Sequence, residues 1–148
     1  MNLDTSTPMN RLQGALLELE GNGAGVPIET WHTFAAGLVA RTIFIPAGTV
    51  LVGAIHKAEC LCICQGDITV RTADGEPRRL TGYHVLPSSH GAKRAGWAHA
   101  DTWWTTVSLN PDELRDPDAI EEALVQDADT LQRRRLLALK ATPLEALV

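Results

Sequence analysis

Short apolar segments separated by turn residues dominate the middle of this chain. They are rich in β-branched and aromatic residues, which favour strands over helices. About eight to ten such segments fill residues 37–109, a spacing that is typical of a β-sandwich or a β-barrel. The strands that the pattern predicts are 37–45, 49–55, 61–65, 68–72, 78–80, 83–86, 93–99 and 102–109.

Glycine, proline and aspartate mark the turns between these strands. Pro46-Ala47-Gly48 joins two strands, and Asp74-Gly75 is a strong β-hairpin signal. We also expect the chain to turn at Gly66-Asp67 and to break between two short strands at Gly82. The middle of the chain is therefore predicted to be an antiparallel barrel.

The two ends of the chain have a different pattern. Residues 1–36 are expected to form an N-terminal extension with a short amphipathic helix over residues 10–20, and a strand there is the alternative. Residues 37–112 form the predicted barrel. Residues 113–148 form a predicted C-terminal helical extension.

A single long helix is predicted within this C-terminal extension. Asp116-Pro117 is typical of an N-cap followed by a proline at the first helical position, and apolar residues at helical spacing continue to Lys140. Such a helix is too long to be covered by one face of a small barrel, so part of its apolar stripe needs a partner. We therefore expect a homo-oligomer in which residues 117–148 contribute to the subunit interface.

Charge and composition narrow the classes of partner. The formal net charge is -5, which disfavours binding to nucleic-acid phosphates. No apolar run reaches the length of a membrane span, so no membrane partner is expected. The first ten residues have neither a basic start nor an apolar centre, so we expect no secretion by a signal peptide.

The three cysteines, Cys60, Cys62 and Cys64, alternate along one predicted strand. Neighbours at this spacing are poorly placed for a disulfide with each other, and an odd count favours reduced thiols. A zinc site is the alternative, but its ligands are usually spaced more widely. We interpret the run as a strand face of small apolar side chains.

Two motifs in this region resemble those of the cupins. The spacing from Glu59 to Gly66 resembles the second half of the first cupin motif, and Gly82 to Gly91 resembles the second motif. The segments HTFAAGLVARTIFIPAGTVLVGAIHKAE and GAKRAGWAHADTWWTTV are similar to the small cupin-like proteins of tailed phages and prophages. The resemblance covers residues 32–112. It implies a mainly β fold, the cupin-type double-stranded β-helix or jelly-roll barrel, followed by a C-terminal α-helix.

The resemblance also implies where a metal would be bound, and the chain departs from that pattern. Gly53, Ile55 and Arg94 occupy the positions of the usual histidine ligands, and only Glu59 matches. We therefore expect no tightly bound transition metal and no other cofactor. If a divalent transition metal is bound, the candidate ligands are His56, Glu59, Cys60 and His99.

The same residues offer chemistry without a metal. His99 and Asp101 could act together as a general base, and the alternative is that both lie at a strand end. An ion pair between Arg94 and Glu59 would fill the place of the metal. Strand alternation puts Glu59 and Cys60 on opposite faces, and the sequence leaves open which one lines the barrel. Three residues are candidates for a ligand pocket: Arg94, Cys60 and Trp104.

Two classes of function remain open after these observations. The first is a non-catalytic homo-oligomeric scaffold, such as an assembly or virion-associated module that contacts other phage structural proteins. It rests on the incomplete ligand set and on the phage-type resemblance, which implies a location in the host cytoplasm or in association with the virion. The second is a small cupin enzyme, such as an isomerase or epimerase acting on a sugar or another small polar substrate, with His56, Glu59, His99 and Asp101 as catalytic candidates.

Overall fold

The computed structural model describes residues 28–53, 55–72, 75–91, 93–126 and 137–140. The predicted helix over residues 10–20 lies outside these ranges. Within them the chain forms, in order, β1 (Glu29–Ala35), β2 (Leu38–Ile45), β3 (Thr49–Val52), β4 (Ile55–His56), β5 (Cys60–Thr72), β6 (Arg78–Ser88), β7 (Arg94–Ala98), β8 (Thr102–Leu109), α2 (Pro117–Leu124), β9 (Val125–Gln126) and β10 (Leu137–Lys140).

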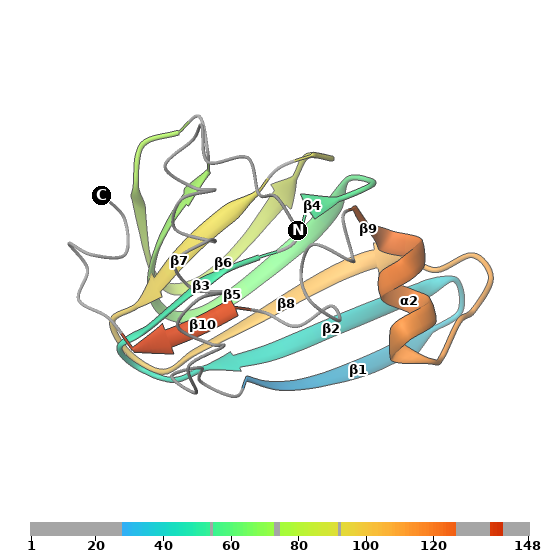
Figure 1. Ribbon diagram of the computed structural model, residues 1–148, viewed down its shortest axis with the longest axis horizontal. Helices are drawn as coiled ribbons and strands as arrows, with labels where there is room; N and C mark the ends of the chain where they lie inside the picture. The colour runs from blue at the N-terminus through green and yellow to red at the C-terminus, as the bar shows by residue number, and fades with distance from the viewer. Residues whose placement is uncertain (1–27, 54, 73–74, 92, 127–136, 141–148) are drawn as a thin grey trace, which may run out of the picture.

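The strands form one strongly curled sheet. Its order is β1-β2-β8-β5-β7-β3-β10, with β6 paired to β5, and every pair is antiparallel. A small second sheet pairs β4 with β9. Figure 1 shows the strands curving into a half-barrel, with α2 beside one end of the sheet. The predicted mainly β fold is therefore confirmed, and the sheet begins at Glu29 rather than at residue 37.

Strand β5 forms the corner at which the sheet curls. Its first half, Leu61 to Gln65, pairs with β8, and its second half, Ile68 to Thr72, pairs with β7. Strand β6 runs along β5 through both halves, so that Gly66 lies opposite Gly82. The turn predicted at Gly66-Asp67 and the break predicted at Gly82 are therefore wrong. Both glycines lie within long strands instead of ending them.

The inner face of β5 carries the cysteines. Cys60, Cys62 and Cys64 are buried, whereas Leu61, between the first two, is 48% exposed. This register answers the question that the sequence left open: Cys60 faces inwards, and Glu59 is exposed. The buried core next to the cysteines is apolar and consists of Ile43, Ile45, Leu51, Cys64, Ile68, Leu80 and Ala98.

The start of the predicted C-terminal helix is confirmed and its end is wrong. Asp116 caps α2 by accepting a hydrogen bond of 3.1 Å from the Ala119 N–H, and Pro117 is the first helical residue. The helix ends at Leu124, and residues 137–140 form β10, which pairs antiparallel with β3. The edge of β3 offers unpaired backbone groups to a strand, and that contact between distant segments overrides local helical spacing. No helix in the described part of the chain has both the length and the apolar character that crossing a bilayer requires.

Candidate functional site

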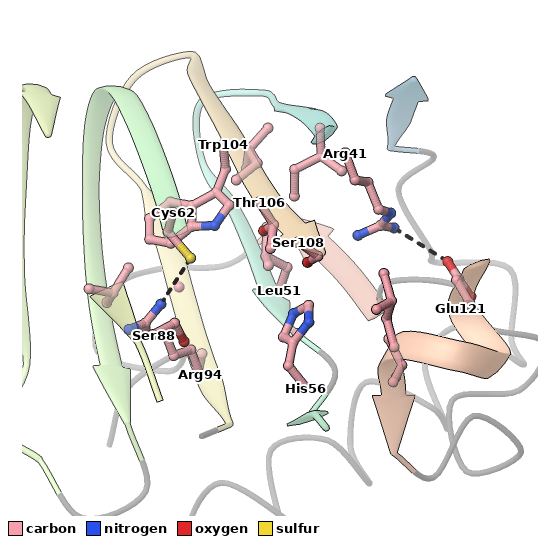
Figure 2. A pocket seen from close by; sticks show the side chains of 18 of the residues that line it. Arg41, Leu51, His56, Cys62, Ser88, Arg94, Trp104, Thr106, Ser108 and Glu121 are labelled. Atoms are coloured by element: carbon pink, nitrogen blue, oxygen red, sulfur yellow. Dashed lines mark hydrogen bonds and ion pairs between the residues drawn. The ribbon is translucent and has the colours of Figure 1, made fainter. Parts of the chain in front are cut away.

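A partly open cavity of about 120 Å³ lies on the concave side of the sheet, between the strands and α2. Its walls are mostly apolar, from residues such as Val39, Ile43, Leu51 and Ile68. The polar side chains at the cavity come from six strands, β2, β4, β5, β6, β7 and β8, and from the helix α2. Figure 2 shows their placement, and they are Arg41, His56, Cys62, Ser88, Arg94, Thr106, Ser108 and Glu121.

One end of the cavity is built around the Cys62 thiol. The Arg94 guanidinium lies beside it, with 3.4 Å between Nη1 and Sγ, and Figure 2 marks this contact. A hydrogen bond from Cys60 lowers the pKa of Cys62 to about 6, aided by Arg94 and Thr106 and opposed by burial. The other two thiols behave in the opposite way. The hydrogen bond to Cys62 raises the pKa of Cys60, and burial raises that of Cys64 to about 11.

The other end of the cavity is built around Arg41. Figure 2 shows its guanidinium directed towards Glu121 on α2, and the Nη2–Oε1 distance is 3.8 Å. Burial lowers the pKa of Arg41, although Glu121 opposes this, and an arginine remains charged at neutral pH in any case. The Arg41 Nε is buried without a hydrogen-bond partner among the described residues. A buried donor of this kind costs free energy until an acceptor reaches it.

His56 lies between these two ends, at the short strand β4. Burial is the main cause that lowers its pKa, and the positive charges of Arg41 and Arg94 add to the effect. Since an ordinary histidine has a pKa of about 6.5, His56 is neutral at pH 7. A neutral imidazole offers one hydrogen-bond donor and one acceptor to a ligand without adding charge.

The structure separates the other sequence candidates from this cavity. Glu59 is exposed and lies immediately before β5, so the predicted pair with Arg94 does not form, and Arg94 contacts Cys62 instead. The predicted pair of His99 and Asp101 does not form either. His99 hydrogen-bonds Thr69 Oγ1 at 2.6 Å through Nε2, and Asp101 accepts a hydrogen bond of 2.9 Å from the Ala47 N–H.

Trp104 and Cys60 have different relations to the site. The Trp104 ring lines the cavity wall, with its centroid 5.9 Å from the Arg94 guanidinium carbon. Cys60 does not line the cavity, but its hydrogen bond lowers the pKa of Cys62, which does line it. Sequence reasoning missed Arg41 and Cys62 as site residues. The signal for Arg41 was available, because it is the one charged residue of strand β2 and alternates with Val39, Ile43 and Ile45 on the buried face of that strand.

Comparisons with known proteins give the fold. No protein-family model matches the chain, and no curated protein matches it. A salicylate 1,2-dioxygenase from Pseudaminobacter salicylatoxidans superposes with a TM-score of 0.51 at 18% identity, over 78% of this chain and 34% of its own. A protein from Neisseria meningitidis gives 0.50 at 10% identity, over 64% and 96%. A cupin superfamily protein from Desulfitobacterium hafniense gives 0.47 at 14% identity, over 57% and 79%.

This protein has the cupin fold. At these identities the similarity to solved structures shows the fold alone, and the chain spans about a third of the dioxygenase. The resemblance of the sequence to phage-encoded cupins stays a prediction.

The metal site of cupin enzymes does not fit the residues present. A transition metal needs three or four protein ligands around one point. The candidate ligands are dispersed: His56 lines the cavity, Glu59 is exposed, and His99 packs edge-on against Trp97 at 4.0 Å between ring centroids. Within the described ranges, no three His, Cys, Asp or Glu residues are grouped to hold a metal ion. Whether the purified protein carries a metal remains a prediction.

Proposed function

We propose that this cupin-fold protein binds a small organic carboxylate with an apolar body in its cavity. The observation that carries the proposal is the buried Nε of Arg41, which lacks a partner among the described residues and belongs to a guanidinium at an apolar cavity. A guanidinium binds a carboxylate through two parallel hydrogen bonds, and such charge-assisted pairs are among the strongest hydrogen bonds in proteins. The proposal develops the small-ligand class of function rather than the scaffold.

The partners of the two arginines explain why Arg41, rather than Arg94, would bind the ligand carboxylate. At the Cys62 end of the cavity the Arg94 guanidinium already has a partner, because its Nη1 lies 3.4 Å from the Cys62 Sγ. At the other end Glu121 is 3.8 Å from one nitrogen of Arg41, too far for a hydrogen bond of good geometry. A ligand carboxylate would therefore give Arg41 the close acceptor that Glu121 does not provide.

The size and walls of the cavity define the rest of the ligand. An engineered apolar cavity of about 150 Å³ accepts benzene, so a cavity of similar size suits a ring or a short branched chain. Trp104 supplies an aromatic wall. The dioxygenase of similar fold is named for salicylate, an aromatic carboxylate, which makes benzoate a reasonable first probe.

Binding of benzoate tests this proposal against its uncharged isostere benzamide. We expect isothermal titration calorimetry to show that benzoate binds about tenfold more tightly than benzamide, because hydrogen bonds to a charged group contribute about 1.5–3 kcal/mol. Arg41→Gln should remove this preference. Arg79→Gln should retain it, since Arg79 is an exposed arginine that pairs with Asp67 at 2.7 Å. Equal affinities for the two probes in the unmodified protein, or no binding of either, would contradict the proposal.

We propose in addition that the protein is a homo-oligomer that associates through the outer face of its sheet. Strand register aligns outward-facing residues in rows: Trp31, Thr42, Thr105, Ile63 and Val85 form one row across β1, β2, β8, β5 and β6. Exposed apolar side chains on this face include Trp31, Leu61, Tyr83, Val85 and Trp103. We call this surface the outer apolar face.

A second copy of the chain is the partner that suits the outer apolar face. The row with Trp31 contains no charged side chain, and the neighbouring row, Glu29, Phe44, Trp103, Gln65 and Tyr83, carries a charge only at its β1 end. Two copies can therefore bury the centre of the face without desolvating a charge. The sequence pattern predicts an interface at a long C-terminal helix instead. That helix ends at Leu124, and its apolar Ile120 is buried at the cavity of its own subunit. A role in phage assembly remains a prediction.

Light scattering on a charged variant tests the homo-oligomer. We expect the unmodified protein to be oligomeric at micromolar concentration and Val85→Lys to be monomeric, because a buried unpaired ammonium costs several kcal/mol. The control is Ser89→Lys, at an exposed loop position. Circular dichroism should show that both variants remain folded. A monomeric unmodified protein, or a folded Val85→Lys variant that keeps the oligomer, would disprove the assignment.

A further inference from the structure

The three thiols on the inner face of β5 are not equivalent. Cys62 lines the cavity, whereas Cys60 and Cys64 pack beside it without being part of the lining. The Arg94 guanidinium also lines this cavity, and its Nη1 lies 3.4 Å from the Cys62 Sγ. Figure 2 shows this sulfur directed towards Arg94. One strand therefore carries one thiol that a ligand can reach and two that it cannot.

We infer that Cys62 is a nucleophile that reacts covalently with a small electrophilic carboxylate bound in the cavity. The inference rests on the proposed function, because Arg41 would hold the carboxylate end of that ligand. It adds the chemistry of the other end. The ligand class is an α,β-unsaturated carboxylate, whose electrophilic carbon is separated from the anionic group by a short apolar segment.

The reaction is a conjugate addition. The lone pair of the Cys62 thiolate forms an S–C bond to the β-carbon of the alkene. The π electron pair of the C=C bond moves to the α-carbon, which takes a proton from water, and hydroxide is released to solvent. The product is a thioether, with no change of net oxidation state, so the step needs no oxidant, reductant or further cofactor.

The surroundings of Cys62 favour the thiolate, which is the nucleophilic form of cysteine. Cys60 donates a hydrogen bond to it, and the Arg94 charge and the Thr106 hydroxyl also stabilise the anion, so that its pKa is lowered to about 6. Burial opposes this effect. The titratable and charged side chains that share this site from β2, β4, β5, β7 and α2 are Arg41, His56, Cys60, Cys64, Arg94 and Glu121.

Alkylation of the folded protein with iodoacetamide tests the nucleophile by itself. In this test an S–C bond forms, the C–I bond breaks and iodide leaves. We expect peptide mass spectrometry at pH 7 to find the label on Cys62 alone, with Cys60 and Cys64 labelled only after denaturation. The rate should follow a midpoint near pH 6, as the thiolate fraction does, and should be level above pH 7. Labelling of Cys60 or Cys64 before Cys62, or no labelling in the folded state, would overturn the inference.

Two variants separate activation of the thiol from recognition of the carboxylate. Arg94→Gln should move the pH midpoint of labelling upwards, and Cys60→Ser offers a second test of activation should Arg94→Gln fail to fold. Arg41→Gln should lower the rate ratio of iodoacetate to iodoacetamide by about tenfold, since one charge-assisted contact is lost. Arg79→Gln, at an exposed arginine outside the cavity, should leave both rates unchanged. If the ratio is unchanged in Arg41→Gln while Cys62 still reacts, Arg41 does not bind the carboxylate, and the assignment of Cys62 as the nucleophile still holds.

Monomethyl fumarate then tests the proposed ligand class. It is a small α,β-unsaturated carboxylate, and we expect it to add once, at Cys62, in the folded protein. Benzoate in excess should protect the thiol if both occupy the cavity. Addition to denatured protein only, or equal addition to all three cysteines, would show that the cavity does not select this ligand class.

Discussion

Gly66→Ala is expected to destabilise the protein by about 3 kcal/mol, because it places a side chain into a closely packed corner of the sheet. A Cβ at this position would lie 2.7 Å from the Thr102 Cα and 2.8 Å from the Asp101 carbonyl oxygen. Both are backbone atoms and cannot move aside as a flexible side chain would. The backbone of Gly66 also has φ +150, a conformation that is strained for any residue with a side chain.

Denaturant unfolding of Gly66→Ala and Gly82→Ala distinguishes crowding from backbone strain. Gly82 lies opposite Gly66 on β6 with φ +83, but a Cβ there meets no heavy atom within 4 Å. We expect Gly82→Ala to lower the free energy of unfolding by only about 1–2 kcal/mol, the cost of the left-handed conformation alone. Equal losses for the two variants would show that the close approach to Thr102 is not what requires glycine at Gly66.

Thr102→Val is expected to cost about 2 kcal/mol, because it leaves a backbone N–H at the same corner without its acceptor. The Thr102 hydroxyl accepts a hydrogen bond of 3.1 Å from the Asp67 N–H and donates one of 2.9 Å to the Ala100 carbonyl. Thr102 is fully buried, so water does not replace these bonds readily. Valine keeps the shape of threonine, so the lost hydrogen bonds account for most of the change.

Thr49→Val is the matched control, with an expected effect of the opposite sign. Thr49 is also fully buried, but its hydroxyl oxygen lacks a hydrogen-bond partner among the described residues. Replacing an unsatisfied buried hydroxyl by a methyl group should leave the free energy of unfolding unchanged or raise it by about 1 kcal/mol. Thermal unfolding of both variants provides the measurement. A loss of stability in Thr49→Val as large as that in Thr102→Val would contradict this account.

The location of the strands was predictable because it depends on local patterns. Apolar segments and their flanking turn residues predicted β2, β3, β7 and β8 to within a few residues. The start of α2 was predictable for the same reason, since an aspartate followed by a proline caps a helix in any fold. The corner at Gly66 was not. A glycine reads as a turn in the sequence, whereas here it allows two backbones to approach closely.

Only part of the candidate site could be predicted from the sequence. His56, Arg94 and Trp104 were singled out and line the cavity, whereas Glu59, His99 and Asp101 were singled out and lie elsewhere. Motif spacing drew attention to Glu59. Its exposure follows from the register of β5, and a shift of one residue along a strand exchanges the two faces.

The mainly β fold and the capped helix after the last predicted strand could be predicted from the sequence, because alternation and turn chemistry are properties of neighbouring residues. Tertiary structure alone decided that the cysteines face inwards, that Arg94 meets Cys62, and that Arg41 meets Glu121. It also decided that residues 137–140 form a strand. All four features depend on contacts between segments that are distant in the sequence. Local sequence does not decide which of a strand's two faces is buried or which segment pairs with its free edge, and packing against another segment decides both.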